Sequence, residues 1–160
     1  MKEIIEKLIK LNKTISTMES CTGGSLAGSI TNIEGASSVF KYGAVTYSNE
    51  YKIKMGVSEE VIDKYSVYSE NTAKEMSKSI SNFTNSDYGI GITGKLNRAD
   101  ENNAYGEDDT VYISIYDKDT RCYHNAELKV IYKTREENKQ YVIDKVIELL
   151  GGILWEYIIH

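Results

Sequence analysis

The sequence is poor in the residues that bind metals and form disulfides. Its 160 residues include two cysteines and two histidines. Cys21 and Cys122 form no CxxC pair, and two histidines are too few for a zinc-type cluster. We therefore expect neither a disulfide framework nor a zinc site. Proline is absent altogether, and this absence by itself indicates no function.

Long apolar runs and blocks of positive charge are missing as well. The formal net charge is −5 and no block of Lys or Arg stands out, so nothing favours nucleic acid or an anionic membrane as the main partner. The first residues, MKEII, are amphipathic and include an acid, unlike a signal peptide. No apolar run is long enough to span a bilayer. We expect a cytoplasmic protein with no nucleic-acid partner and no membrane partner.

The apolar pattern predicts a single α/β domain over residues 1–160, a length that suffices for a real core. Helical periodicity and capping residues predict helices at 2–11, 24–32, 50–55 and 58–65, from 69 onward with Phe83 on the buried face, and from 134 to the Gly151-Gly152 pair. Alternation predicts strands at 14–18, 40–47, 87–93, 110–116 and 121–132. Because helices alternate with strands early and an antiparallel hairpin comes late, we expect a three-layer α/β/α sandwich with a mixed, mostly parallel sheet.

Two further segments have no place in this alternation. The stretch 94–109 is polar without an apolar period, and we expect a long loop, which in a compact domain is usually functional or disordered. The tail 153–159 is apolar and contains Trp and Tyr. It is expected either to fold back on its own domain or to form the interface of a homo-oligomer, with a dimer as one possibility.

The stretch TMESCTGG at 17–24 joins an expected strand to an expected helix. It carries two nucleophile-capable side chains, Ser20 and Cys21, followed by a glycine pair. Such a junction lies at the carboxyl end of a strand, where open α/β sheets bind ligands. The glycines let the backbone pass close to a ligand, and the N–H groups of the following helix attract anions. The alternative is an ordinary glycine-containing connection with a Ser/Thr helix cap, and this stretch alone does not decide between them.

A nucleophilic serine needs a partner that accepts its proton. The histidine candidates for a Ser–His–Asp arrangement are His124, expected as an exposed strand residue, and His160, the last residue. Cys21 is expected to pack as a small apolar group. A lysine or tyrosine can replace histidine, and Tyr47 and Lys52 can reach the sheet edge that holds Ser20, provided that burial or a nearby cation lowers the pKa of the lysine. On spacing alone, a strand-end tyrosine and a surface lysine remain the alternative.

Several motifs follow one another in a distinctive order: ESCTGG at 19–24, GASSVF at 35–40, YSNE at 47–50 followed by Lys52, VYSE at 67–70, ITG at 92–94 and TRE at 134–136. In this order and spacing they resemble the C-terminal domain family of the competence-damage-inducible protein CinA, which is also found alone as nicotinamide mononucleotide amidohydrolase. The resemblance runs from about residue 2 to residue 150. Several motifs in one order are far more specific than any one of them.

The resemblance implies hydrolysis of the carboxamide of nicotinamide mononucleotide, giving nicotinic acid mononucleotide and ammonia, with no metal and no cofactor. It implies that Ser20 is the nucleophile and that Tyr47 and Lys52 assist it. Ser20 would form an acyl-enzyme while Lys52, directly or through Tyr47, moves the proton. Substrate binding is expected from backbone donors after the first strand, from a strand end, and from a basic residue for the phosphate: Cys21, Thr22, Gly23, Gly24, Thr93, Gly94 and Arg135. A surface arginine is the alternative for Arg135.

The stretch 95–109 departs from the family pattern. The family has a loop rich in glycine and proline here, whereas this chain has acids and almost no glycine. Such a loop offers fewer bare N–H groups to a phosphate, and its carboxylates repel one. Lys95 or Arg98 are candidates to supply the missing donors. Two alternatives therefore stay open: a non-catalytic nucleotide-binding or protein-interaction module of the same fold, or an amidase for a non-phosphorylated amide.

Overall fold

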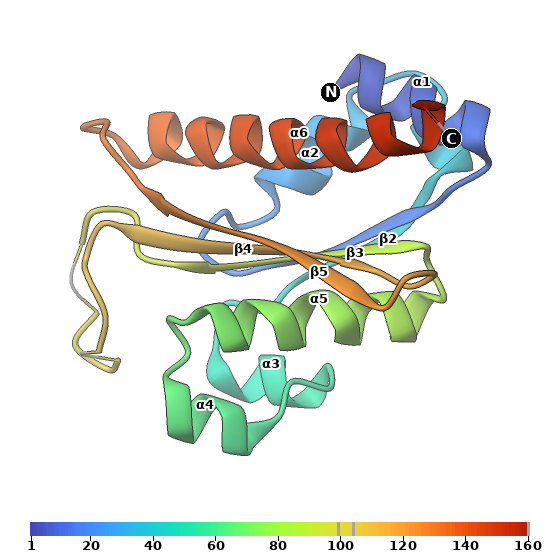
Figure 1. Ribbon diagram of the computed structural model, residues 1–160. Helices are drawn as coiled ribbons and strands as arrows, with labels where there is room; N and C mark the ends of the chain where they lie inside the picture. The colour runs from blue at the N-terminus through green and yellow to red at the C-terminus, as the bar shows by residue number, and fades with distance from the viewer. Residues whose placement is uncertain (99, 104, 160) are drawn as a thin grey trace.

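A mixed five-stranded sheet forms the middle layer of the computed structural model, which describes residues 1–98, 100–103 and 105–159 (Figure 1). The strand order is β2-β1-β3-β4-β5, with β1 at Ile15–Glu19, β2 at Phe40–Val45, β3 at Tyr88–Gly94, β4 at Thr110–Asp117 and β5 at Cys122–Lys129. β1 pairs in parallel with β2 and β3, whereas β4 pairs antiparallel with β3 and β5. Four strands therefore run in one direction, and the expected mixed sheet with a late hairpin is confirmed.

Helices cover both faces of this sheet (Figure 1). One face carries α1 (Lys2–Leu11), α2 (Ser25–Thr31) and α6 (Arg135–Ile159), and the other carries α3 (Asn49–Lys54), α4 (Glu59–Tyr65) and α5 (Glu70–Thr84). A short 3₁₀ turn, Ala36–Ser38, precedes β2. The three-layer α/β/α sandwich is thus confirmed. No helix in the described ranges is both long and apolar enough to cross a membrane.

β3 presents isoleucine side chains to one helical layer and glycines to the other, so the two layers pack against it differently. Ile90 and Ile92 are fully buried in the core beneath α1, α2 and α6. The alternate positions, which point to the other face, are Gly89 and Gly91. A Cβ at Gly89 would lie 1.9 Å from the carbonyl oxygen of Ser77, and one at Gly91 would lie 2.4 Å from that of Ala73. Glycine is therefore required for α5 to approach the strand this closely.

Two predictions about the helices are wrong. α6 does not end at the glycine pair but continues to Ile159, because Leu150, Ile153 and Leu154 are all buried in the core and this packing offsets the poor helix propensity of glycine. Phe83 does not face the core: its side chain is 64% exposed and lies against the ring of Tyr42, with centroids 5.3 Å apart. The homo-oligomer expected from the tail stays a prediction.

The topology brings three loops to one edge of the sheet. β1, β2 and β3 are mutually parallel neighbours, so their carboxyl ends meet at the same side. Ser20 follows β1, Tyr47 follows β2, and Lys95 follows β3. Ligand sites of open α/β sheets form at this edge.

Gly91→Ala tests the close packing of α5 on β3. The new methyl group would meet backbone atoms of Ala73 and Ser77 at 2.4 and 2.7 Å, which cannot rotate away. We expect the free energy of unfolding in urea to fall by at least about 1–3 kcal/mol. Gly28→Ala in α2 is the matched control, because its Cβ would meet nothing within 4 Å; it should be neutral or slightly stabilising. Equal stability of the two variants would contradict the packing.

Candidate active site

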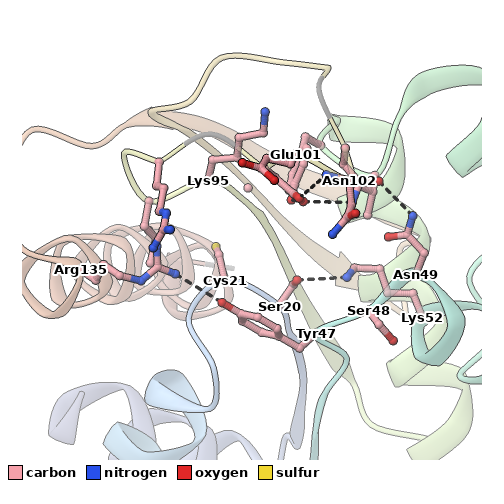
Figure 2. A pocket seen from close by; sticks show the side chains of 17 residues that line it. Ser20, Cys21, Tyr47, Ser48, Asn49, Lys52, Lys95, Glu101, Asn102 and Arg135 are labelled. Atoms are coloured by element: carbon pink, nitrogen blue, oxygen red, sulfur yellow. Dashed lines mark hydrogen bonds between the residues drawn. The ribbon is translucent and has the colours of Figure 1, made fainter.

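A cleft of about 960 Å³ opens at the carboxyl edge of the sheet. Its walls come from the turn after β1, the start of α3, the segment before α5, the loop after β3 and the start of α6 (Figure 2). The described residues that line it are Ser20, Cys21, Tyr47, Ser48, Asn49, Lys52, Val67, Tyr68, Gly94, Lys95, Leu96, Arg98, Asp100, Glu101, Asn102, Asn103 and Arg135. The volume is in the range typical of sites for small molecules.

Ser20 and Lys52 form the closest polar pair in the middle of this cleft. The Nζ of Lys52 lies 3.0 Å from the Oγ of Ser20 and 2.7 Å from the carbonyl oxygen of Thr46, and the two side chains point toward each other (Figure 2). Lys52 is 1% exposed, and Ser20 is also buried. Burial lowers the pKa of Lys52 from 10.5 to about 8. A substantial fraction of this lysine is therefore neutral near pH 8 and able to accept the serine proton.

Local sequence explains why Lys52 enters the site. Ser48 caps α3, its Oγ accepting a hydrogen bond from the N–H of Tyr51 at 3.3 Å. Lys52 is the fourth residue of this short helix, and its side chain points back toward the end of β2. There its ammonium donates a hydrogen bond to the carbonyl oxygen of Thr46. The surface-lysine alternative is therefore wrong.

Glu19 holds in place the turn at 20–24 that carries Ser20, a role that sequence reasoning missed. Its buried carboxylate accepts hydrogen bonds from the hydroxyl of Thr22 (2.7 Å) and from the N–H groups of Leu26 (2.9 Å) and Ala27 (3.0 Å). The last two lie in the first turn of α2, where a negative charge is stabilised by the helix dipole. The side chain thus links the last residue of β1 to the helix beyond the turn and fixes Ser20 between them. The signal was available: a glutamate directly before a serine and a helix start.

Cys21 contributes packing rather than a nucleophile. Its side chain is buried in the core cluster, as expected for a free cysteine. Burial raises the pKa of the Cys21 thiol from 9.0 to about 12. At neutral pH the thiol keeps its proton, and a protonated thiol is a poor nucleophile. Of the two nucleophile-capable side chains in the turn, Ser20 is the one that contacts a buried lysine.

The turn that follows Ser20 provides backbone donors. Gly23 donates its N–H back to the carbonyl of Ser20 at 2.9 Å, and Gly23 and Gly24 both have positive φ, as this tight turn requires. Within the described chain, the N–H groups of Cys21 and Thr22 donate no hydrogen bond to another residue. Cys21 lines the cleft next to Ser20, whereas Thr22 is fully buried and is not among the described lining residues.

Tyr47 and Arg135 meet at the mouth of the cleft. A guanidinium nitrogen of Arg135 lies 3.4 Å from the Tyr47 hydroxyl oxygen (Figure 2). Tyr47 is 66% exposed, and within the described residues its hydroxyl makes no hydrogen bond with Ser20 or Lys52. The contact to the serine is thus made by Lys52, while Tyr47 lies at the entrance together with an arginine at the start of α6.

Other residues expected to bind substrate take different positions. The hydroxyl of Thr22 donates a hydrogen bond to the Glu19 carboxylate. The hydroxyl of Thr93 donates one to the carbonyl oxygen of Val67 at 2.9 Å. Neither threonine is among the described residues that line the cleft. Gly23 and Gly24 are also not among them, whereas Gly94 is. His124 lies on the edge strand β5, partly exposed and away from the cleft-lining residues, whereas His160 lies outside the described residues.

The polar loop after β3 forms one wall of the cleft. Between β3 and β4 its described residues form no regular helix or strand, as expected for 94–109. Asp100 accepts hydrogen bonds from the hydroxyl of Tyr68 and from the amide of Asn103, whose own oxygen accepts from Asn49 at 3.2 Å. These bonds tie the loop to the segment before α5 and to the start of α3. The hydrogen bond from Tyr68 lowers the pKa of Asp100, so this carboxylate is ionised.

The sandwich and its buried pair define an α/β protein with a serine–lysine site at the carboxyl edge of a mixed sheet. A family model described as the CinA C-terminal domain matches residues 1–154, and the chain belongs to this family. Competence-damage inducible proteins are similar to it: one from Alkaliphilus metalliredigens is 48% identical over 92 residues, which is 57% of this chain and 22% of that protein. One from Clostridium novyi is 49% identical over 96 residues, 59% of this chain and 23% of that protein. The match thus spans less than a quarter of these curated relatives.

Solved structures share the fold. A CinA superfamily protein from Klebsiella pneumoniae superposes with a TM-score of 0.87 at 24% identity, covering 97% of this chain and 95% of that one. A CinA superfamily protein from Escherichia coli gives a TM-score of 0.85 at 25% identity, covering 95% and 87%. The expected fold class and family are therefore confirmed.

Glu19→Gln tests the anchoring of the nucleophile turn. The amide keeps the size of the side chain but replaces one acceptor oxygen by a donor, which then faces an N–H of α2. We expect the free energy of unfolding to fall by about 1–3 kcal/mol, the usual cost of an unsatisfied buried group. Glu34→Gln, an exposed position, is the control. If both variants unfold at the same urea concentration as the parent, Glu19 does not anchor the turn.

Proposed function

We propose that this chain is a serine amidohydrolase that converts nicotinamide mononucleotide and water into nicotinic acid mononucleotide and ammonia. The observation that carries the proposal is the buried contact of 3.0 Å between the Lys52 amine and the Ser20 hydroxyl. A serine beside a lysine of lowered pKa is an activated nucleophile, a known alternative to the serine–histidine pair. Membership of the CinA C-terminal domain family supports the same reaction.

In the proposed reaction Ser20 Oγ attacks the amide carbon while neutral Lys52 takes the hydroxyl proton. The carbonyl oxygen becomes an anion, and the N–H group of Cys21, which directly follows Ser20, lines the cleft and donates no hydrogen bond to another described residue, is the donor proposed to stabilise it. The tetrahedral intermediate then breaks its carbon–nitrogen bond, and the Lys52 ammonium returns the proton so that ammonia leaves. Water hydrolyses the resulting acyl-enzyme with Lys52 again as the base, giving the carboxylic acid and restoring Ser20.

The charges of the cleft support a phosphorylated substrate. Among the described residues that line it, four are basic, Lys52, Lys95, Arg98 and Arg135, and two are acidic, Asp100 and Glu101. Arg135 at the start of α6 combines a guanidinium with a helix N-terminus, both of which favour a phosphate. The acidic residues of the loop therefore do not make the cleft negative. We infer that Tyr47, which accepts a hydrogen bond from Arg135 and is largely exposed, helps to position the entering substrate rather than taking the serine proton.

The proposal is tested by incubating the protein with nicotinamide mononucleotide and measuring ammonia and nicotinic acid mononucleotide together. We expect equal amounts of both products, and Ser20→Ala should lose turnover by at least about a thousandfold while keeping its fold. Ser37→Ala, an exposed serine that does not line the cleft, is the control for the loss of a hydroxyl. A Ser20→Ala protein with the parent rate would contradict the nucleophile assignment. Nucleotide binding without turnover would favour the alternative of a non-catalytic binding module.

The lowered pKa of Lys52 predicts the pH dependence of the reaction. Because the base must be neutral, kcat/KM should rise with pH and level off above an apparent pKa of about 8. Lys52→Arg should lower kcat/KM by about 10²–10⁴-fold at every pH, since a guanidinium does not lose its proton. Lys54→Arg, an exposed position on the same helix, should keep the parent profile. A pH-independent rate between pH 6 and 9 in the parent would exclude Lys52 as the base.

A further inference from the structure

Lys95 is a buried charge that takes no part in the proposed steps at Ser20. It directly follows Gly94 at the end of β3, and its N–H donates to the carbonyl of Thr110 at 3.0 Å. The residue is 4% exposed, yet it lines the cleft. A lysine with so little contact with water is rare unless its charge is paired. A buried ammonium at this position therefore needs a counter-charge or hydrogen-bond acceptors.

The described contacts balance this charge in part. The Nζ lies 3.3 Å from an Asp108 carboxylate oxygen and 4.9 Å from the centre of the Tyr68 ring. The Asp108 side chain is 56% exposed and is not among the described residues that line the cleft, so water and ions compete for it. An ammonium has three N–H donors, and within the described residues Lys95 uses one of them in a hydrogen bond. Two donors are thus available to a ligand.

Of the two described acids on the cleft wall, Asp100 is held by other groups, whereas Glu101 makes no hydrogen bond or ion pair with another described residue. Asp100 is held by the Tyr68 hydroxyl, by Asn103 at 3.0 Å and by the N–H of Asn102 at 3.0 Å. Tyr68 therefore stands between the two charges, its ring against Lys95 and its hydroxyl on Asp100. Figure 2 shows Lys95 on the loop side of the cleft, with Tyr47 and Lys52 on the opposite side. A substrate that reaches Ser20 with its amide can extend its other end toward Lys95.

We propose that the Lys95 ammonium binds the phosphate of the substrate and makes the site specific for a nucleotide over the corresponding nucleoside. The phosphate takes the two available donors, and the dianion replaces the weakly held Asp108 as the main counter-charge of the lysine. The catalytic consequence rests on the proposed amidohydrolase function, whereas binding of a phosphate at Lys95 does not. Free phosphate and a nucleotide share this chemistry, and the experiment distinguishes them.

The test compares nicotinamide mononucleotide with nicotinamide riboside, which lacks the phosphate, in the parent and in Lys95→Met. Methionine keeps the unbranched shape of the side chain up to the ε position and removes the ammonium. We expect the ratio of kcat/KM for the nucleotide to kcat/KM for the riboside to fall at least about tenfold, as for the loss of a hydrogen bond to a charged group. A merely structural role would lower both values together and leave the ratio constant, and that result would overturn the proposal.

Asp108→Asn gives a second readout of opposite sign. If the phosphate competes with Asp108 for the ammonium, removing the carboxylate charge should lower KM for nicotinamide mononucleotide, whereas Lys95→Met raises it. If the ion pair only supports the loop, both variants should raise KM, and the proposal fails. Lys145→Met, which removes another lysine paired with a surface acid, is the control for the loss of charge.

The two proposals fail separately. A parent protein that hydrolyses neither amide contradicts the proposed reaction, and calorimetry then decides the role of Lys95. In that case nicotinic acid mononucleotide should bind Lys95→Met at least about tenfold more weakly than the parent. Equal binding to both proteins would overturn the phosphate assignment. Tight binding of inorganic phosphate alone, without a further gain for the nucleotide, would overturn the specificity for nucleotides.

Discussion

The site depends on a lysine that is removed from water and held against a serine hydroxyl. Burial lowers the pKa of Lys52 from 10.5 to about 8, which corresponds to a cost of about 3 kcal/mol, since each tenfold change in proton affinity is worth about 1.4 kcal/mol. The cost is fully present below the lowered pKa and disappears as pH rises toward 10.5, because the unfolded chain binds the proton more tightly. The same lowering supplies the neutral amine that the proposed reaction needs. Reduced stability and reactivity therefore have one cause.

The rest of the fold fixes the two partners of this contact. Parallel pairing of β1 with β2 and β3 brings their carboxyl ends together, and the Ser48 cap starts α3 so that Lys52 turns back onto Thr46. Glu19 ties the end of β1 to the first turn of α2 and so restrains the turn that carries Ser20 from the other side. A pair held from two independent elements keeps its geometry without substrate, which is the preorganisation that the proposed catalysis requires. The loop after β3 forms another wall of the cleft, with the basic residues Lys95 and Arg98 followed by the acidic residues Asp100 and Glu101.

Much of this arrangement could be predicted from the sequence, and the exceptions have physical reasons. Periodicity located the described helices and strands to within a few residues, but it placed the end of α6 at Gly151, because a local breaker says nothing of the buried side chains on either side of it. The pairing of Ser20 with Lys52 followed from motif order, whereas the lysine's burial depends on tertiary packing. Glu19 is part of the ESCTGG motif, but its role was not predicted. Its three hydrogen bonds link residues across a turn, and such contacts leave no periodic pattern in the sequence. Lys95 was a candidate donor, and its burial next to Tyr68 again depends on contacts distant in sequence.

The most direct test of this picture is the titration of the Lys52 side chain itself. The lysine ε-carbons can be labelled with ¹³C, and their chemical shifts can be measured by NMR between pH 6 and 11. The Lys52 signal is assigned by its absence in Lys52→Met. Burial of the ammonium beside Ser20 predicts a midpoint of about 8. A midpoint near 10.5, the ordinary value, would mean that the amine stays protonated and hydrated at neutral pH. Lys52 would then be a surface charge beside Ser20 rather than its activator.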